Sequence, residues 1–95
     1  MKPLEPLDGE VYAPSEVARF FLFEHALRST RHICDVPAGL SITEALDLSL
    51  EDSGWRNKYR HNFTIFLQDG TAVPEHMWDR VRLKAGTTAV ARPVA

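Results

Sequence analysis

Hydrophobic and polar positions alternate most regularly between residues 63 and 68, in the sequence FTIFLQ. Successive side chains of a β-strand point to opposite faces. The odd-numbered residues therefore form an apolar face, and the even-numbered residues form the opposite, more polar face. The pair Asp69 and Gly70 follows directly, and such a pair is typical of a tight turn between strands. The pattern therefore predicts a strand over 63–68 that ends in a turn at Asp69–Gly70.

A helical pattern covers residues 41–54, SITEALDLSLEDSG. Apolar or small side chains recur along one face, at Ile42, Ala45, Leu46, Ser49 and Leu50. The Ser41 hydroxyl can accept a hydrogen bond from the Glu44 amide, and the Glu44 side chain can reach back to the Ser41 amide, which together form a capping box. With Gly54 available as the terminator, we expect a helix whose apolar face packs against a sheet.

The N-terminal part of the chain is less regular. Residues 1–16 contain three of the six prolines, and we expect an extended arm there. Two dense apolar runs follow, 17–27 and 31–39, and the polar residues between them favour a hairpin of two strands. A helix over 14–29 competes with the first strand, because Ser15 suits a helix start and the apolar spacing is ambiguous in so dense a run.

The C-terminal part predicts shorter elements. Residues 74–81, PEHMWDRV, favour one helical turn that starts at Pro74, since proline is well tolerated in the first turn. Trp78 lies four residues later, and we expect it to fold back on the sheet edge or the helix end as a structural peg that closes the core. Residues 81–95 then favour two short extended pieces on either side of Lys84–Gly86.

Taken in order, these elements predict an α+β fold. A mixed sheet of four or five strands, with one main helix packed across it, is the economical way to bury their apolar faces. This arrangement is the β-grasp or ubiquitin-like one, and we expect it over residues 17–95. A chain of 95 residues has room for only one such core.

Composition narrows the function further. Hydrophobic residues at 44% and charged residues at 25% are ordinary for a globular protein, and a net charge of -2 gives no general attraction to nucleic acid or to anionic lipid. No apolar run approaches the roughly 18 residues that a membrane-spanning helix needs. The single cysteine, Cys34, excludes a disulfide within one chain. The first residues show no secretory or transit signal, so we expect synthesis in a cytoplasm.

The titratable residues form no recognisable catalytic or metal-binding motif. The chain has four histidines, His25, His32, His61 and His76. None of their spacings matches an HxH or HxxxH pair of metal ligands. Cys34 lies near His32, but we expect the two side chains to point to opposite faces of a strand, which leaves Cys34 as a small buried apolar residue. Four carboxylates are expected on the solvated face of the helix, at Glu44, Asp47, Glu51 and Asp52.

Basic residues gather in two short segments, 55–61 (WRNKYRH) and 80–84 (RVRLK). Aromatic and cationic side chains are interleaved in this way in sites for single-stranded nucleic acid and in protein interfaces, and the overall acidity favours a protein partner. In the second segment three cations alternate with Val81 and Leu83, which places the cations on one face of a strand and suits an acidic partner. The candidate interface residues are Trp55, Arg56, Lys58, Tyr59, Arg60, Arg80, Arg82 and Lys84.

Residues 36–94 resemble the small β-grasp domain at the N-terminus of tail-tip host-specificity proteins of long-tailed bacteriophages. Those domains have a glycine before a capped helix, a strand ending in a polar-Gly turn, VP, a tryptophan, and a glycine before a strand that ends in RPVP. The matching positions are Gly39, Ser41, Glu44, Asp69, Gly70, Val73, Pro74, Trp78, Arg80, Val81, Lys84, Gly86, Arg92 and Pro93.

The resemblance implies a non-enzymatic virion protein of the tail tip or baseplate, made in the cytoplasm of a bacterial host. It implies docking on other tail-tip or baseplate proteins, in repeated copies within a symmetric assembly, without a cofactor, a metal or a small-molecule substrate. From their expected places in caps, turns and the core, we assign structural roles to Ser41, Glu44, Asp69, Gly70, Pro74, Trp78 and Gly86.

Two alternatives share the expected fold. The chain is similar, more distantly, to the sulfur-carrier proteins of thiamin and molybdopterin biosynthesis, but a carrier needs a C-terminal Gly-Gly, and this sequence ends in RPVA. A ubiquitin-like carrier or regulatory protein is therefore one alternative to the tail-tip role. A small RNA-binding β-grasp module is the other.

Overall fold

The computed structural model describes residues 16–24, 31–55 and 59–94. Its elements in chain order are β1 (Val17–Phe23), β2 (Arg31–Pro37), α2 (Ile42–Ser53), η2 (Arg60–Asn62), β3 (Phe63–Leu67), β4 (Ala72–Val73), η3 (Glu75–Met77) and β5 (Thr88–Pro93). The first apolar run forms a strand as far as Phe23, so the helix alternative is wrong there. Apart from Glu16, the predicted arm over 1–16 lies outside the described residues.

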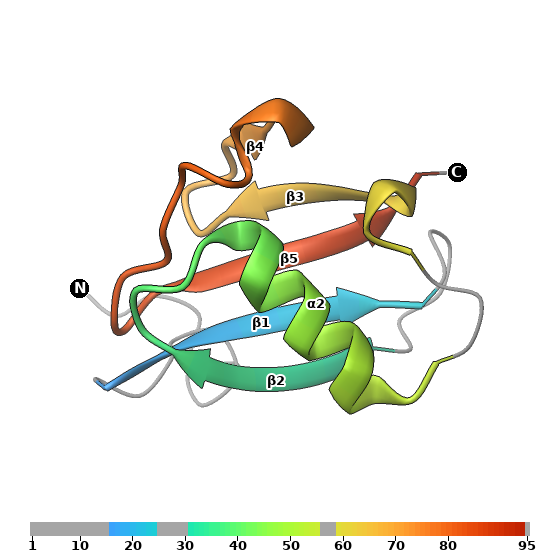
Figure 1. Cartoon of the computed structure of the whole chain (residues 1–95), viewed down its shortest axis with the longest axis horizontal. Coiled ribbons are helices and arrows are strands. Elements are labelled where there is room, and N and C mark those ends of the chain that lie inside the picture. Colours follow the sequence, from blue (N-terminus) through green and yellow to red (C-terminus); the bar gives the residue numbers. More distant parts are fainter. Residues whose placement is uncertain (1–15, 25–30, 56–58, 95) are drawn as a thin grey trace.

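The strands form one five-stranded mixed sheet in the order β2-β1-β5-β3-β4. β1 pairs antiparallel with β2 and parallel with β5, and β3 pairs antiparallel with both β5 and β4. α2 lies diagonally across one face of this sheet (Figure 1). The α+β architecture, with one helix packed on a mixed sheet, is therefore as predicted from the sequence.

The core lies between the sheet and α2. Along β1, Ala18, Phe20 and Leu22 are fully buried, whereas the residues between them are half-buried. Burial of a side chain such as Phe20 or Leu22 contributes about 1.5–3 kcal/mol. β5 places Ala89 and Ala91 beside them in parallel register, and both alanines are fully buried too. The alternation in β1 thus fixes which face of the sheet receives the helix.

α2 has well-defined ends. The Glu44 amide donates to the Ser41 hydroxyl at 3.2 Å, and the Ser41 amide donates to a Glu44 carboxylate oxygen at 3.0 Å, so the reciprocal capping box is present. The hydrogen bond from the Ser41 backbone lowers the pKa of the Glu44 carboxyl. At the other end, Gly54 adopts a left-handed conformation with φ 71°, and its amide donates to the Glu51 carbonyl at 3.3 Å. In the described residues no helix is long and apolar enough to span a membrane.

The segment after η3 differs from the prediction. Residues 81–84 were expected to form a strand, but they contribute only an isolated bridge between Arg82 and Ser41, and β5 begins at Thr88. Three of their backbone hydrogen bonds go to residues 39–42, which lead into α2, and none of those observed in the described residues reaches a sheet strand. The Ile42 amide donates to the Val81 carbonyl at 3.0 Å, and the Leu83 amide donates to the Leu40 carbonyl at 2.9 Å. This segment therefore anchors the start of the helix.

Trp78 lies in the core with an exposed fraction of 2%. Its indole N–H donates to the Val73 carbonyl at 2.9 Å, which connects the turn after η3 to β4. Met77 and Val81, on either side of this turn, are half-buried against the same core. The indole thus fills space inside the domain and satisfies its single polar group there.

Candidate protein interface

The candidate interface residues fall into two groups at opposite ends of β3. Tyr59 and Arg60 precede the first residue of β3, whereas Arg82 and Lys84 border a groove beyond its last residue, Leu67. A strand rises about 3.3 Å per residue, so five residues separate the groups by roughly 16 Å. Figure 1 shows η2 and the loop before β5 at opposite ends of the sheet. The two basic segments therefore do not form one surface, and Arg56 and Lys58 lie outside the described residues.

The first group is largely engaged in contacts within the domain. Trp55 is half-buried and meets the His32 ring edge-on, with ring centroids 6.1 Å apart. Tyr59 is 57% exposed, and its ring stacks on His61 at 5.8 Å. The guanidinium of Arg60 lies 3.7 Å from an Asp47 carboxylate oxygen, and both side chains are about half exposed. Such an exposed pair contributes little to stability.

The second group forms an exposed row of cations, which we call the basic ridge: Arg80, Arg82 and Lys84. All three are exposed, while Val81 is half-buried and Leu83 is buried between them. The predicted alternation of cations and apolar residues is therefore present, although the segment is no sheet strand. The buried Leu83 side chain holds the ridge on the core.

Arg82 is the ridge residue with the most contacts. Its guanidinium donates to the Gly39 carbonyl at 2.8 Å and lies 3.9 Å from a Glu44 carboxylate oxygen. Within the described part of the chain, Arg80 and Lys84 take part in none of the observed ion pairs. The ridge therefore presents positive charge that the domain itself neutralises only in part.

A surface groove of about 650 Å³ runs beside the basic ridge. Leu67, Val81 and Leu83 supply its apolar lining, and Arg82 and Lys84 supply its cations. Open grooves with an apolar lining and a few polar groups are the usual places for a ligand or a partner side chain to bind.

The far side of this groove is braced by the turn after β3. The Gln68 side-chain oxygen accepts a hydrogen bond from the Thr88 amide at 2.9 Å and ties the end of β3 to the start of β5. Asp69 accepts a hydrogen bond from the Thr71 amide at 2.9 Å, and this bond lowers the pKa of its carboxyl. The turn glycine, Gly70, has a φ of 90°, a conformation that favours glycine. The groove is therefore bordered by hydrogen-bonded backbone on both sides.

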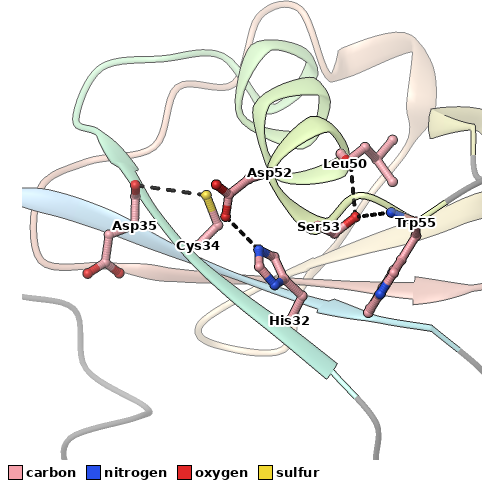
Figure 2. A network of polar contacts seen from close by, with 7 residues as sticks. All are labelled: His32, Cys34, Asp35, Leu50, Asp52, Ser53 and Trp55. Carbon is pink, nitrogen blue, oxygen red and sulfur yellow. Dashed lines mark hydrogen bonds and ion pairs between the residues drawn. The ribbon is translucent and has the colours of Figure 1, made fainter.

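His32 and Cys34 do not point to opposite faces, and that expectation is wrong. They are two residues apart on β2, so both side chains face α2. Figure 2 shows them beside Asp52 at the end of the helix, where a His32 ring nitrogen and an Asp52 carboxylate oxygen are 2.6 Å apart. Asp52, expected only to be solvated, thus ties the helix end to the edge strand.

The Cys34 thiol is poorly suited to nucleophilic chemistry. It is half-buried, not fully buried as expected, and donates to the Asp35 carbonyl over 3.9 Å. Burial raises the pKa of the thiol, the charges of Asp52 and Asp35 raise it further, and the Ser49 hydroxyl acts in the opposite direction. A raised pKa leaves little thiolate at neutral pH, and the thiolate is the reactive form. The network in Figure 2 has no hydrogen bond between Cys34 and His32.

Metal ligands do not converge in the described part of the chain. No group of three or more histidine, cysteine, aspartate or glutamate side chains there is placed to hold an ion. His61 and His76 are exposed, and His25 lies outside the described residues.

On the sheet face turned away from α2, arginine side chains lie over phenylalanine rings in cation–π contacts. The guanidinium of Arg92 lies 4.3 Å from the centre of the Phe23 ring, and that of Arg31 lies 5.6 Å from the Phe21 ring. These contacts cover apolar surface with charged groups. Sequence reasoning did not identify this face, although Phe21 and Phe23 lie an odd number of residues from the buried Phe20 and Leu22, which was a signal for it.

Sequence reasoning also missed the groove and the contact between His32 and Asp52. The groove lies between segments that are about fifteen residues apart in the chain, and no local sequence pattern predicts that they come together. For the His32 contact a signal existed, because the i, i+2 rule places His32 and Cys34 on one face.

No family model, no curated protein and no solved structure matches the chain.

Proposed function

We propose that this chain is a structural component of the tail tip or baseplate of a long-tailed bacteriophage, acting by docking on other proteins of that assembly. The proposal includes the β-grasp fold. The pattern of residues over 36–94 supports it, and a five-stranded mixed sheet with one helix across it is compatible with it. Repetition of the chain around the tail axis would turn weak single contacts into a stable ring.

The observation that carries a docking role is the basic ridge beside an apolar groove. Arg80, Arg82 and Lys84 are exposed on a segment that the buried Leu83 fixes to the core. Cations around a desolvated apolar centre are the common composition of protein interfaces, in which arginine is frequent. The anchoring of this segment matters because a surface that is already ordered loses little entropy when it binds.

The chemistry of the remaining polar groups supports a binding role over catalysis. His32 and Asp52 connect two elements of the fold, and burial keeps the nearby Cys34 thiol protonated. The groove beside the basic ridge has Leu67, Val81 and Leu83 in its lining and is bordered by an Asp69 carboxylate that already accepts a backbone hydrogen bond. This lining suits contact with a partner.

Imaging of intact particles tests the proposal. The gene is deleted from the genome that encodes the chain and is restored with an epitope-tagged copy, and the particles are purified by density gradient and labelled with gold-conjugated antibody. We expect label at the distal end of the tail, and defective tails in the deletion. Normal particles from the deletion strain, without the chain in tagged virions, would overturn the proposal. Salt-sensitive retention of RNA, or a thiocarboxylate mass shift, would then direct attention to the RNA-binding or carrier alternative.

A further inference from the structure

The backbone of residues 81–83 is hydrogen-bonded along one side. The Val81 carbonyl accepts from the Ile42 amide at 3.0 Å, and the Leu83 amide donates to the Leu40 carbonyl at 2.9 Å. The Leu83 carbonyl also accepts from the Gly39 amide at 2.8 Å. These bonds flank the bridge between Ser41 and Arg82, as in a short antiparallel pair.

The opposite side of the same segment is an open edge. In an extended chain, neighbouring residues direct their backbone groups to opposite sides, so the N–H and C=O of Arg82 point away from Ser41. The Lys84 N–H points the same way as those of Arg82, whereas the Lys84 carbonyl accepts from the Thr87 amide at 3.2 Å. Within the residues that the structure describes, the Arg82 N–H, the Arg82 C=O and the Lys84 N–H have no hydrogen-bond partner. Three unpaired groups in a row are what an added strand requires.

The side chains at this edge select the charge of an added strand. Arg82 and Lys84 project from the edge residues themselves, and both line the groove of about 650 Å³. Two cations oppose pairing with the same edge of a second copy, because like charges opposite each other on paired strands are destabilising. Carboxylates on the incoming strand are favoured for the same reason. Leu67 and Leu83, in the groove lining, offer contact to one aliphatic side chain of that strand.

We propose that the edge formed by Arg82 and Lys84 receives an extended acidic segment of a partner protein, which adds as a short β-strand and places one aliphatic side chain in the groove. The proposal rests on the docking role above and names the class of partner. Backbone hydrogen bonds supply the general attraction, and the two cations and the groove supply the specificity.

An array of immobilised seven-residue peptides tests the partner class on the purified full-length chain. Glutamate alternates with valine, isoleucine or leucine in the test set, and lysine or glutamine replaces glutamate in the two control sets. We expect binding to the acidic set at least tenfold above the lysine set. Equal binding to the acidic and lysine sets, or to neither, would refute the charge selection. Displacement of the acidic peptides by oligouridylate at an equal concentration would assign the site to nucleic acid instead.

Amide hydrogen exchange by NMR tests the added strand. The strongest acidic peptide should slow exchange of the Arg82 and Lys84 amides at least tenfold, and N-methylation of alternate peptide residues should abolish this protection. The double variant Arg82→Glu, Lys84→Glu should lower affinity at least tenfold. The matched control, Arg60→Glu, is a reversal at the other end of β3 and should leave affinity within twofold. Peptide binding that leaves both amides unprotected would end the strand proposal.

The two tests separate this inference from the proposed function. A chain that is found at the tail's distal end but binds no acidic peptide contradicts only the strand proposal. A chain that binds acidic peptides at this edge but is absent from virions contradicts only the tail-tip role.

Discussion

Replacing Trp78 with alanine tests whether the indole belongs to the core of the domain. The side chain is 2% exposed, and its N–H donates to the Val73 carbonyl at 2.9 Å. Truncation of a buried tryptophan to alanine costs about 3–5 kcal/mol, and loss of the hydrogen bond adds roughly 0.5–1.5 kcal/mol. A domain of 95 residues has a total stability of roughly 5–14 kcal/mol, at about 0.05–0.15 kcal/mol per residue. We therefore expect Trp78→Ala to lose a large share of its stability.

Urea unfolding followed by far-UV circular dichroism measures this loss without relying on tryptophan fluorescence. If Trp78→Ala is too unstable for a native baseline, Trp78→Phe provides the measurement, with an expected cost of roughly 1–2.5 kcal/mol from the lost hydrogen bond and a smaller cavity. This corresponds to a melting temperature lower by about 4–8 °C for each kcal/mol. Trp55→Phe is the matched control, and its cost should be smaller, because Trp55 is only half-buried at the edge of the core.

One outcome would place the Trp78 indole outside the core. If Trp78→Phe melts at the wild-type temperature while the variant fails to assemble, the indole contributes to an interface and not to the core. A larger cost for Trp55→Phe than for Trp78→Phe would contradict the ranking of the two side chains by burial.

Three further outcomes are expected. Ser41→Ala should lower the free energy of unfolding by about 1 kcal/mol in urea titrations, and an unchanged midpoint would contradict the capping role. The Arg19 guanidinium, 2.7 Å from the Asp35 carboxylate, lowers the pKa of that carboxyl. The ion pair therefore stabilises the fold above the pKa of about 3.9 that the Asp35 carboxyl has in the unfolded chain. This stabilisation disappears as the pH falls through the lowered pKa of the folded state. Asp35→Asn should therefore lose less stability than the wild type when the pH is lowered from 5 to 2. Cys34 should react with iodoacetamide at pH 7 more slowly than in the urea-unfolded chain, and Asp52→Asn should speed the reaction, because removing that charge lowers the pKa of the thiol.

The helix and the clearest strand were predictable because their signals are local. The capping residues Ser41 and Gly54 lie within the segment that they delimit, and the alternation over 63–67 needs no knowledge of the partner strands. The turn at Asp69–Gly70 is encoded in two adjacent residues. Such features depend on neighbours along the chain, which a sequence displays directly.

The features that depended on distant residues were not predictable in the same way. Residues 81–84 have the alternation of a strand, but their backbone pairs with that of residues 39–42. Neither segment contains a local sequence signal that predicts this pairing. The two basic segments are separate because they lie near opposite ends of β3. The common face of His32 and Cys34, in contrast, was available from spacing alone.

The parallel pair of β1 and β5 in the middle of the sheet determines when the core can form during synthesis. Among the described strands, β1 is the first to be synthesised and β5 the last, yet they lie side by side in the middle of the sheet. Until β5 has left the ribosome, the strand that lies between β1 and β3 is missing. The pair β1 and β2, together with α2, then has no complete sheet to pack against. The domain therefore completes its core only after residues 88–93 leave the exit tunnel, and nascent chains arrested before that point should be open to proteases.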